Sequence, residues 1–350
     1  MRTTASLLAV AFALCGVRPA LHAQVTSPSG GVSHQFRYIM GTSVEVRAYN
    51  GDEATRTVAI DEAFAAIAEV DRLMSNYRND SELAAVNATA ATSPVRLSDP
   101  LFSVLAAARQ VSDRSGGAFD ITVGPLERLW GFHDKKPHLP SAAELDAVKP
   151  LVNSRNLLLD NAAHTIRFAR PGVEIDLGGI AKGFAVELAA NVLKGHGLAG
   201  FIDAGGNQYM LGLPPGKPSW TVGVRDPDRP DGLIGEIDSP GGSVSTSAGY
   251  ATFLVGPDGK RYGHIMDPRT LHPTDACLSV TTISADGTLA DAVSTAAFVL
   301  GPDRGLALIN SFPGMSGVIV YRAADGKPAI AMTKSLEGRF HRIGPSTFHP

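Results

Sequence analysis

The pattern of hydrophobic and polar residues changes character near residue 157. Before that point most of the periodicity is helical, with apolar residues at helical spacing and charges on the other side over 52–74, which predicts a helix there. Capping residues predict two further helices, one opening at 80–83 and one running from Ser98 to about Ser112. An alternating stretch over 36–49 predicts a strand or hairpin ahead of them.

The second half is rich in short β-like runs. After a polar, proline-flanked stretch over 137–150, expected to be a surface excursion, they lie at 157–159, 165–168, 173–175, 200–203, 208–211, 220–225, 234–237, 243–247, 252–255, 278–283 and 317–322. Helices are expected from the glycines at 178–179 to about Leu193, and over 289–300 and 303–310. A helical first part followed by a strand-rich second part with two late helices predicts an α+β fold.

The N-terminus has a pattern of its own. Arg2 precedes an apolar run of nine residues, Ser6–Leu14, and Leu21-His22-Ala23 ends in a small residue. The run is shorter than the roughly 20 apolar residues of a spanning helix, so residues 1–23 are interpreted as a secretory signal peptide. An uncleaved anchor is the alternative. A lipid anchor at Cys15 is a lesser one, because Leu14 stands where lipoprotein signals carry a small residue.

The signal peptide implies export, with membrane association left open. We expect a flexible polar leader over 24–34 and a single domain over 35–345. The chain has 350 residues, 44% of them hydrophobic, and a net charge of −3, so nucleic acid is not an expected partner. Cleavage of the signal peptide leaves Cys277 as the one thiol, so the mature chain can form no internal disulfide. Cys277 is interpreted as a buried small hydrophobic residue.

Two glycine-containing turns have the features of ligand sites. In Asp176-Leu177-Gly178-Gly179, a predicted strand ends and a helix begins, with Lys182 in its first turn. Such a turn lets the backbone approach a ligand and offers free N–H groups to a phosphate. Asp203-Ala204-Gly205-Gly206-Asn207 forms the second turn. The structural alternatives are a capped strand–helix turn for the first and a plain hairpin connection for the second.

Three further segments carry candidate chemistry. His264 lies between a β run and a turn and is either a general base or a structural imidazole. Asp291 and Thr295 are four residues apart on one helix face and form either a hard oxygen site for Mg²⁺ or a helix-terminus interaction. Asp120 lies in an apolar run and is either a site residue or a cap for neighbouring amides. Signatures of zincins, zinc fingers, α/β-hydrolases and kinases are absent from the sequence.

Taken in order, these segments resemble the ApbE family of flavin transferases, which are bacterial FAD:protein FMN transferases. The resemblance runs from about Phe36 to Gly301 and rests on segments that follow one another along most of the mature chain. They are Met40-Gly41-Thr42, Ser75-Asn76-Tyr77-Arg78, GAFDITVGPL from Gly117, EIDLGGIAKG from Glu174, DAGGN from Asp203, YGHIMDPRT from Tyr262 and SVTTISADGTLADAVSTAAFVLG from Ser279.

The resemblance implies an α+β fold around one flavin and Mg²⁺ site. It implies Asp291 and Thr295 as side-chain ligands of Mg²⁺, Gly179 as a backbone ligand, and His264 as catalytic base, with Asp291 also counted as catalytic through its metal. The positions that match the family's FAD contacts are Met40, Tyr77, Ala118, Phe119, Asp120, Asp176, Lys182 and Ile265.

The implied reaction is Mg²⁺-dependent transfer of FMN from FAD to a Thr or Ser hydroxyl of an exported client, a subunit of a respiratory electron-transfer complex. Two other functions stay open: hydrolysis of FAD to FMN and AMP, and flavin binding without catalysis. The sequence departs from the family at Leu271, where glycine is usual, so we expect that loop to differ in shape because leucine disfavours a positive φ. Gly179 also stands where Ala or Thr is common, so a hydroxyl ligand is lost there if the family uses one.

Overall fold

The computed structural model describes residues 31–133, 136, 138–249, 253–255 and 259–343. The signal peptide expected over 1–23 and the leader as far as residue 30 lie outside the described residues. The last part of the expected leader, 32–34, begins a strand, so the leader prediction was wrong there. None of the helices in the described part of the chain is both long and apolar enough to cross a membrane.

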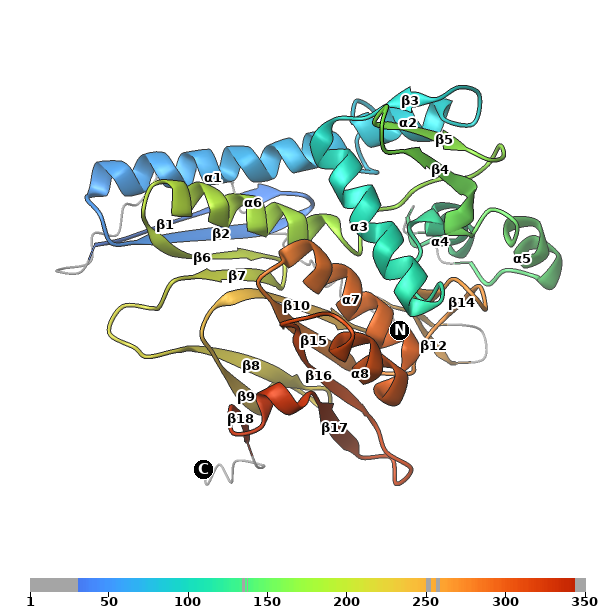
Figure 1. The fold of residues 1–350 in the computed structure, drawn as a ribbon. Coiled ribbons are helices and arrows are strands. Elements are labelled where there is room, and N and C mark those ends of the chain that lie inside the picture. Colours follow the sequence, from blue (N-terminus) through green and yellow to red (C-terminus); the bar gives the residue numbers. More distant parts are fainter. Residues whose placement is uncertain (1–30, 134–135, 137, 250–252, 256–258, 344–350) are drawn as a thin grey trace, which may run out of the picture.

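An eight-stranded, wholly antiparallel sheet forms the middle of the molecule (Figure 1). Its strands, in spatial order, are β1 (Val32–Ile39), β2 (Thr42–Tyr49), β6 (Ala199–Ala204), β7 (Asn207–Leu211), β10 (Gly242–Ala248), β15 (Ser279–Ser284), β16 (Ser316–Arg322) and β17 (Pro328–Met332). Two-residue turns with positive φ join β1 to β2 and β6 to β7, as the right-handed twist of a hairpin requires.

Helices cover one face of this sheet, and a smaller sheet covers part of the other (Figure 1). Four helices of the described chain contact the main sheet: α1 (Glu53–Met74), α6 (Ala181–Gly195), α7 (Gly287–Leu300) and α8 (Pro302–Asn310). Helix α3 (Asp99–Ser115) packs on α7, and the other described helices are α2 (Glu82–Thr89), α4 (Gly124–Trp130) and α5 (Ala142–Val148). The smaller sheet contains β8 (Trp220–Asp226), β9 (Arg229–Ser239) and β18 (Phe340–Arg342).

Three short sheets and three 3₁₀ turns complete the described structure. The sheets are β3 (Val95–Arg96) with β5 (Thr165–Phe168) and β4 (Leu157–Asp160), β11 (Phe253–Val255) with β12 (Arg261–Gly263), and β13 (Met266–Asp267) with β14 (His272–Pro273). The 3₁₀ turns span Ile121–Val123, Ser154–Asn156 and Lys334–Leu336.

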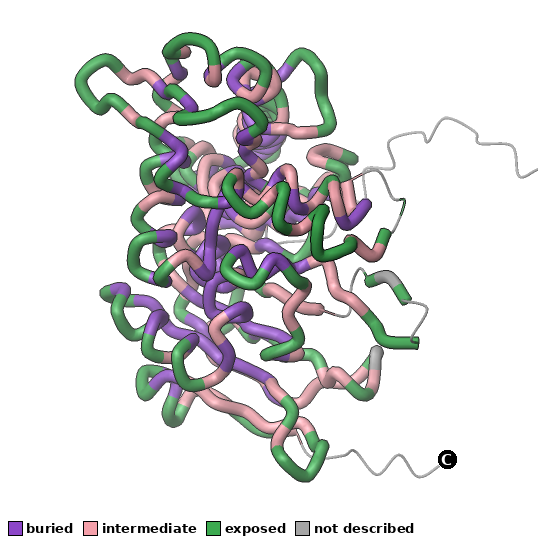
Figure 2. The backbone as a smooth tube through the Cα atoms, turned by 90° about the vertical axis from the view of Figure 1, so that its right-hand side faces the viewer, coloured by how far each residue is buried: buried purple, intermediate pink, exposed green. Residues whose placement is uncertain are grey.

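The hydrophobic core follows this layering. The largest cluster lies between the helices and the main sheet, and a second, which includes Met210, Val222 and Val244, lies between the two sheets. Figure 2 shows the buried backbone concentrated in the middle of the molecule, with exposed segments around it. The arrangement confirms the predicted α+β class.

Most predicted elements are confirmed close to their predicted bounds. Helix α1 begins after Asp52, whose carboxylate accepts a hydrogen bond from the Thr55 amide, and Ser98 caps α3 in the same way. The stretch 137–150 is not only an excursion: it contains α5, which opens with a capping box at Ser141 and Glu144 and has no buried residue.

Candidate functional site

Helices α6 and α7 meet backbone to backbone. A Cβ placed on Gly183 would lie 2.1 Å from the Gly287 carbonyl oxygen and 2.6 Å from the Asp291 Cβ, so only glycine permits this approach. The Gly183 amide donates to Asp291 Oδ2 at 2.9 Å. The close contact brings the Asp291 carboxylate to the N-terminal turn of α6.

The predicted metal ligands come together at this α6–α7 contact. A Cβ on Gly179 would lie 3.3 Å from Thr295 Oγ1 and 3.2 Å from Phe119 Cε2. Thr295 lies one turn after Asp291 on α7, and the Ser247 hydroxyl, from β10, is 3.1 Å from the Thr295 hydroxyl. Residues from four separate stretches of sequence therefore meet in one place.

Asp291 does not serve the start of its own helix, because other carboxylates do so for α7; its helix-terminus interaction is with the first turn of α6, through the Gly183 amide. Asp286 is the N-cap and accepts from the Leu289 amide at 2.8 Å. Glu187, from α6, accepts from the Gly287 amide at 2.8 Å. Asp291 lies further along the helix and faces α6 instead.

Burial raises the pKa of Asp291, and the positive charge of Lys182 and the Gly183 amide oppose that shift. The Lys182 ammonium donates to the Gly178 carbonyl at 3.1 Å. Within the described residues no three His, Cys, Asp or Glu side chains cluster as a metal site. One carboxylate with hydroxyl and carbonyl oxygens suits Mg²⁺, which keeps several waters and binds substrate phosphates through them. The donor set therefore fits that ion.

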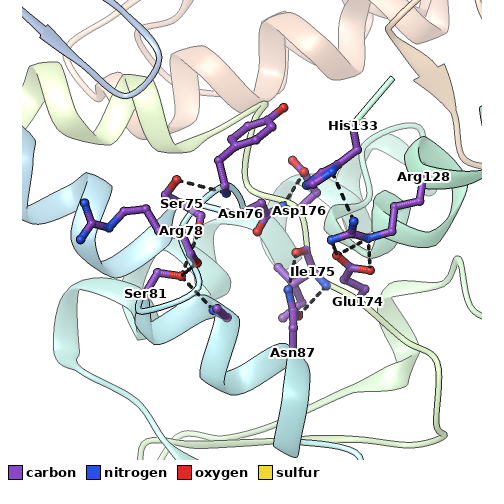
Figure 3. Close-up of polar contacts among 12 residues, drawn as sticks. Ser75, Asn76, Arg78, Ser81, Asn87, Arg128, His133, Glu174, Ile175 and Asp176 are labelled. Atoms are coloured by element: carbon purple, nitrogen blue, oxygen red, sulfur yellow. Dashed lines mark hydrogen bonds and ion pairs between the residues drawn. The ribbon is translucent and has the colours of Figure 1, made fainter. Parts of the chain in front are cut away.

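Asp176 organises a second part of the site. Its carboxylate accepts from the Gly178 amide at 2.6 Å and from the Asn76 side-chain amide (Figure 3). The strand predicted over 173–175 is not present. The Asn87 side chain instead pairs with both backbone groups of Ile175, at 2.8 and 3.0 Å, and so replaces a neighbouring strand.

Tyr77 lies beside Asp176 at the surface. Its side chain is among the most exposed aromatics of the described chain, and its ring stacks on His133 with 5.0 Å between centroids. His133 contacts Arg128, which forms an ion pair with Glu174 (Figure 3). An exposed ring beside a carboxylate is available to stack on a planar ligand.

The turn after β1 reaches the same end of the main sheet. Helix α6 is about 22 Å long and β6 about 20 Å, so β6 returns along α6 to the level of the helix N-terminus. The Gly205–Gly206 turn follows β6, and a Cβ on Gly205 would touch the Thr42 hydroxyl. Met40, in the turn just before Thr42, is thereby brought to this end; it has a φ of 54°.

His264 and Ile265 connect β12 to β13 as predicted. A Cβ on the preceding Gly263 would lie 3.5 Å from the Gly249 carbonyl oxygen, and Gly249 follows β10, two residues after Ser247. Ile265 is buried, and its carbonyl accepts from the Thr274 amide at 3.0 Å. Strand β10 thus links the His264 segment to Thr295.

Comparison with known proteins decides the family. The ApbE family matches residues 40–319. This chain belongs to the ApbE family. A protein of Treponema pallidum named FAD:protein FMN transferase is 33% identical, over 86% of this chain and 89% of that protein.

Solved structures of the family have the same fold. The ApbE protein of Thermotoga maritima is 30% identical, with a TM-score of 0.80 over 88% of this chain and 99% of that one. The flavin transferase ApbE of Vibrio cholerae is 27% identical, with a TM-score of 0.78 over 89% and 100%.

One residue that is expected to contact FAD in this ApbE chain, Asp120, already uses its carboxylate in hydrogen bonds within the protein. Ala118, Phe119 and Asp120 are all buried. The Asp120 carboxylate accepts from the Thr122 amide and hydroxyl, at 2.9 and 2.6 Å, and from the Ser154 amide at 2.6 Å. This is the structural alternative, a cap for neighbouring amides. Burial raises the pKa of Asp120, and these hydrogen bonds oppose the shift.

Leu271 corrects an expectation. It adopts a φ of 63°, the left-handed conformation that leucine disfavours. Its side chain is buried beside Trp130 and Leu126, and its carbonyl accepts from the Trp130 indole at 3.1 Å. Burial and this hydrogen bond offset the backbone cost, so the loop keeps a glycine-like conformation without glycine.

Sequence reasoning missed several neighbours of the site in this ApbE chain. Glu127 lies beside Asp176, and burial with that like charge raises its pKa well above the usual range. Ser247 and His133 were also missed. Nothing in the one-dimensional pattern marks them, because each reaches the site through tertiary contacts. Cys277 is buried as predicted, and burial raises the pKa of its thiol to about 12.

Proposed function

We propose that this protein transfers FMN from FAD to a Thr or Ser hydroxyl of an exported client flavoprotein, with Mg²⁺, and releases AMP. The observation that carries the proposal is the meeting of Gly179, Asp291 and Thr295 beside Lys182 at the α6–α7 contact. Relatives named FAD:protein FMN transferase support the transferase activity. The ion, the acceptor residue and the compartment rest on site chemistry and sequence.

Gly179, Asp291 and Thr295 would hold the ion through carbonyl, carboxylate and hydroxyl oxygens. Mg²⁺ supplies positive charge against the phosphate oxygens of FAD as negative charge develops there. Ser247 positions the Thr295 hydroxyl through its hydrogen bond. The Lys182 ammonium adds a fixed positive charge on the same side, whereas the amides of Ile180, Ala181 and Gly183 at the start of α6 are already hydrogen-bonded within the protein.

The aromatic and apolar residues would bind the ring systems of FAD. Tyr77 offers an exposed face for stacking, and Phe119 adds an apolar ring that is buried against Gly179. Met40 contributes apolar surface from the β1–β2 turn. Asp176, held by Asn76 and the Gly178 amide, orients the turn that precedes α6.

The acceptor hydroxyl oxygen attacks the phosphorus on the FMN side of the pyrophosphate. One P–O bond forms, the P–O bond to AMP breaks, and AMP keeps that bonding pair. His264 accepts the hydroxyl proton, a general-base contribution of about 10²–10⁴-fold. The products are an FMN phosphoester on the client and free AMP.

The client would be an exported subunit of a respiratory electron-transfer complex. The predicted signal peptide supports a periplasmic location, where such domains are exposed, and association with the inner membrane is compatible with that location.

Mass spectrometry of such a purified client domain, incubated with the protein, FAD and Mg²⁺, tests the proposal. We expect one added FMN on a single Thr or Ser, lost when a chelator is present. Free FMN and AMP without an adduct would indicate hydrolysis of FAD instead. FAD that stays intact and bound would indicate a flavin-binding protein.

A further inference from the structure

The two edges of the main sheet differ in a way that points to a partner. The β17 edge has five residues, starts at Pro328, and shows no exposed large hydrophobic side chain among the residues described. The β1 edge has eight residues without proline, and Phe36 and Tyr38 are 58% and 78% exposed. Natural proteins protect sheet edges, so a long edge with exposed aromatics is a candidate for strand pairing.

Along β1, the backbone N–H and C=O groups point alternately toward β2 and away from it. The Met40–Gly41 turn has positive φ at both residues, as in a type I′ turn, so Ile39 and Thr42 form a hydrogen-bonded pair. Bonded pairs alternate along an antiparallel ladder, so the backbone groups of Phe36 and Tyr38 point away from β2. The residues with outward backbone groups are therefore those with exposed aromatic rings.

Side chains on the other face of β1 already contact α1. Arg37 forms an ion pair with Asp61 on α1 and lies 4.4 Å above the Phe64 ring. Ser33 accepts from the Arg56 guanidinium at 3.0 Å. The exposed row consequently lies on the side of the sheet opposite α1, with His34 packed edge-on against Phe36 at 5.5 Å.

From this juxtaposition we infer that β1 is the docking edge for the acceptor segment of the client, which adds to the sheet as a further strand. The inference rests on the proposed function. Strand β1 is continuous with Met40, in the turn that reaches the α6 N-terminus, so a segment paired along β1 has one end at the site. The acceptor hydroxyl has to arrive there.

The chemistry of the edge describes the partner segment. Main-chain hydrogen bonds to β1 provide affinity that is independent of sequence. Alternate side chains of the added strand face Phe36 and Tyr38, so the segment carries apolar residues at every second position on one side of its Thr or Ser.

Two substitutions at one residue test the inference. Phe36→Pro removes an outward N–H without breaking a β1–β2 hydrogen bond, and Phe36→Ser removes the ring. For each we expect kcat/KM for the client domain to fall at least about tenfold, through KM, since burial of a Phe ring is worth roughly that much or more. Leu158→Ser, on β4 and half exposed, is the matched control and leaves kcat/KM unchanged.

FAD binding, followed by flavin fluorescence, separates this inference from the proposed function. We expect both Phe36 variants to bind FAD as the wild type does and to label a large excess of client with near-normal kcat. Unchanged kcat/KM in both variants would overturn the docking edge while leaving transfer intact. A wild-type dimer that Phe36→Pro dissociates, with labelling unaffected, would also overturn it, in favour of a second copy of the chain. No labelling by wild-type protein would instead contradict the proposed function.

Discussion

Asp120 and Asp291 are both buried aspartates in segments that the family resemblance assigns to the site, yet their surroundings differ. Asp120 accepts three hydrogen bonds, from Thr122 and Ser154, and these engage both of its oxygens. Asp291 accepts one from the Gly183 amide and lies near the charge of Lys182. A buried carboxylate whose two oxygens are hydrogen-bonded within the protein stabilises the fold. A buried carboxylate that accepts fewer hydrogen bonds from the protein is suited to bind a cation.

The largest expected effect is on activity, at Asp291. Asp291→Asn keeps an oxygen for the Gly183 amide but removes the charge that would hold Mg²⁺. We expect FMN transfer to fall by about a hundredfold or more, because a metal that stabilises transition-state charge contributes several kcal/mol. Transfer is measured by client mass, and circular dichroism should show an unchanged fold. Wild-type transfer by this variant would remove Asp291 from the metal site.

Asp120→Asn should lower stability and leave activity almost unchanged, which is the reverse of the effect expected for Asp291→Asn. Its amide group would face a backbone or hydroxyl donor in place of an acceptor, so we expect the free energy of unfolding to fall by about 1–3 kcal/mol. Transfer per folded molecule should stay within about threefold of wild type. Urea denaturation and active-site-normalised rates measure the two quantities. A large loss of FAD affinity without loss of stability would show that Asp120 contacts the substrate after all.

These two residues also show how far sequence reasoning reaches. Local features such as the cap at Ser98, the helix over 52–74 and the spacing of Asp291 and Thr295 are encoded within a few residues and were predicted correctly. Periodicity describes a side chain's own element and not what packs against it. The hydrogen bond from Ser154 to Asp120 joins residues 34 apart in sequence, so the sequence left both interpretations of Asp120 open.

The predictions about the fold at 173–175 and at Leu271 were wrong for the same reason, because sequence pattern does not show tertiary contacts. The stretch 173–175 has the composition of a strand, but its backbone is paired by the Asn87 side chain, 88 residues away. Leu271 has a left-handed backbone because Trp130 and a buried pocket hold it there. In both cases a tertiary contact outweighs the local preference.

Protonation affects the two aspartates in the same direction, because burial raises the pKa of both. Burial raises the pKa of Asp291 above its ordinary value of about 4, so the folded state binds its proton more tightly than the unfolded state does. Without metal, wild-type stability should therefore fall as pH rises from about 4 through the raised pKa. Asp291→Asn cannot ionise, so its stability relative to wild type should rise over that window. The stability of Asp120→Asn relative to wild type should rise over the same window, because the pKa of Asp120 is also raised, but the lost hydrogen bonds should keep this variant less stable than wild type throughout.

Denaturation curves between pH 4 and 8, with a chelator present, measure these differences. Parallel curves for wild type and Asp291→Asn would contradict a raised pKa at that position.

The smallest expected effect is at Ser247, which acts on the metal site through Thr295. Ser247→Ala removes neutral hydrogen bonds to the Ser294 and Thr295 hydroxyls, of which the one to Thr295 is worth about 1 kcal/mol, so the Mg²⁺ concentration for half-maximal transfer should rise less than tenfold. The rate at saturating Mg²⁺ should be unchanged, because Thr295 keeps its hydroxyl. Thr246→Ala is the matched control, since that hydroxyl pairs with Thr281 on the opposite face of the sheet. Equal shifts in the two variants would mean that β10 affects the site only through stability, and a shift in Ser247→Ala alone would tie the Thr295 hydroxyl to the ion.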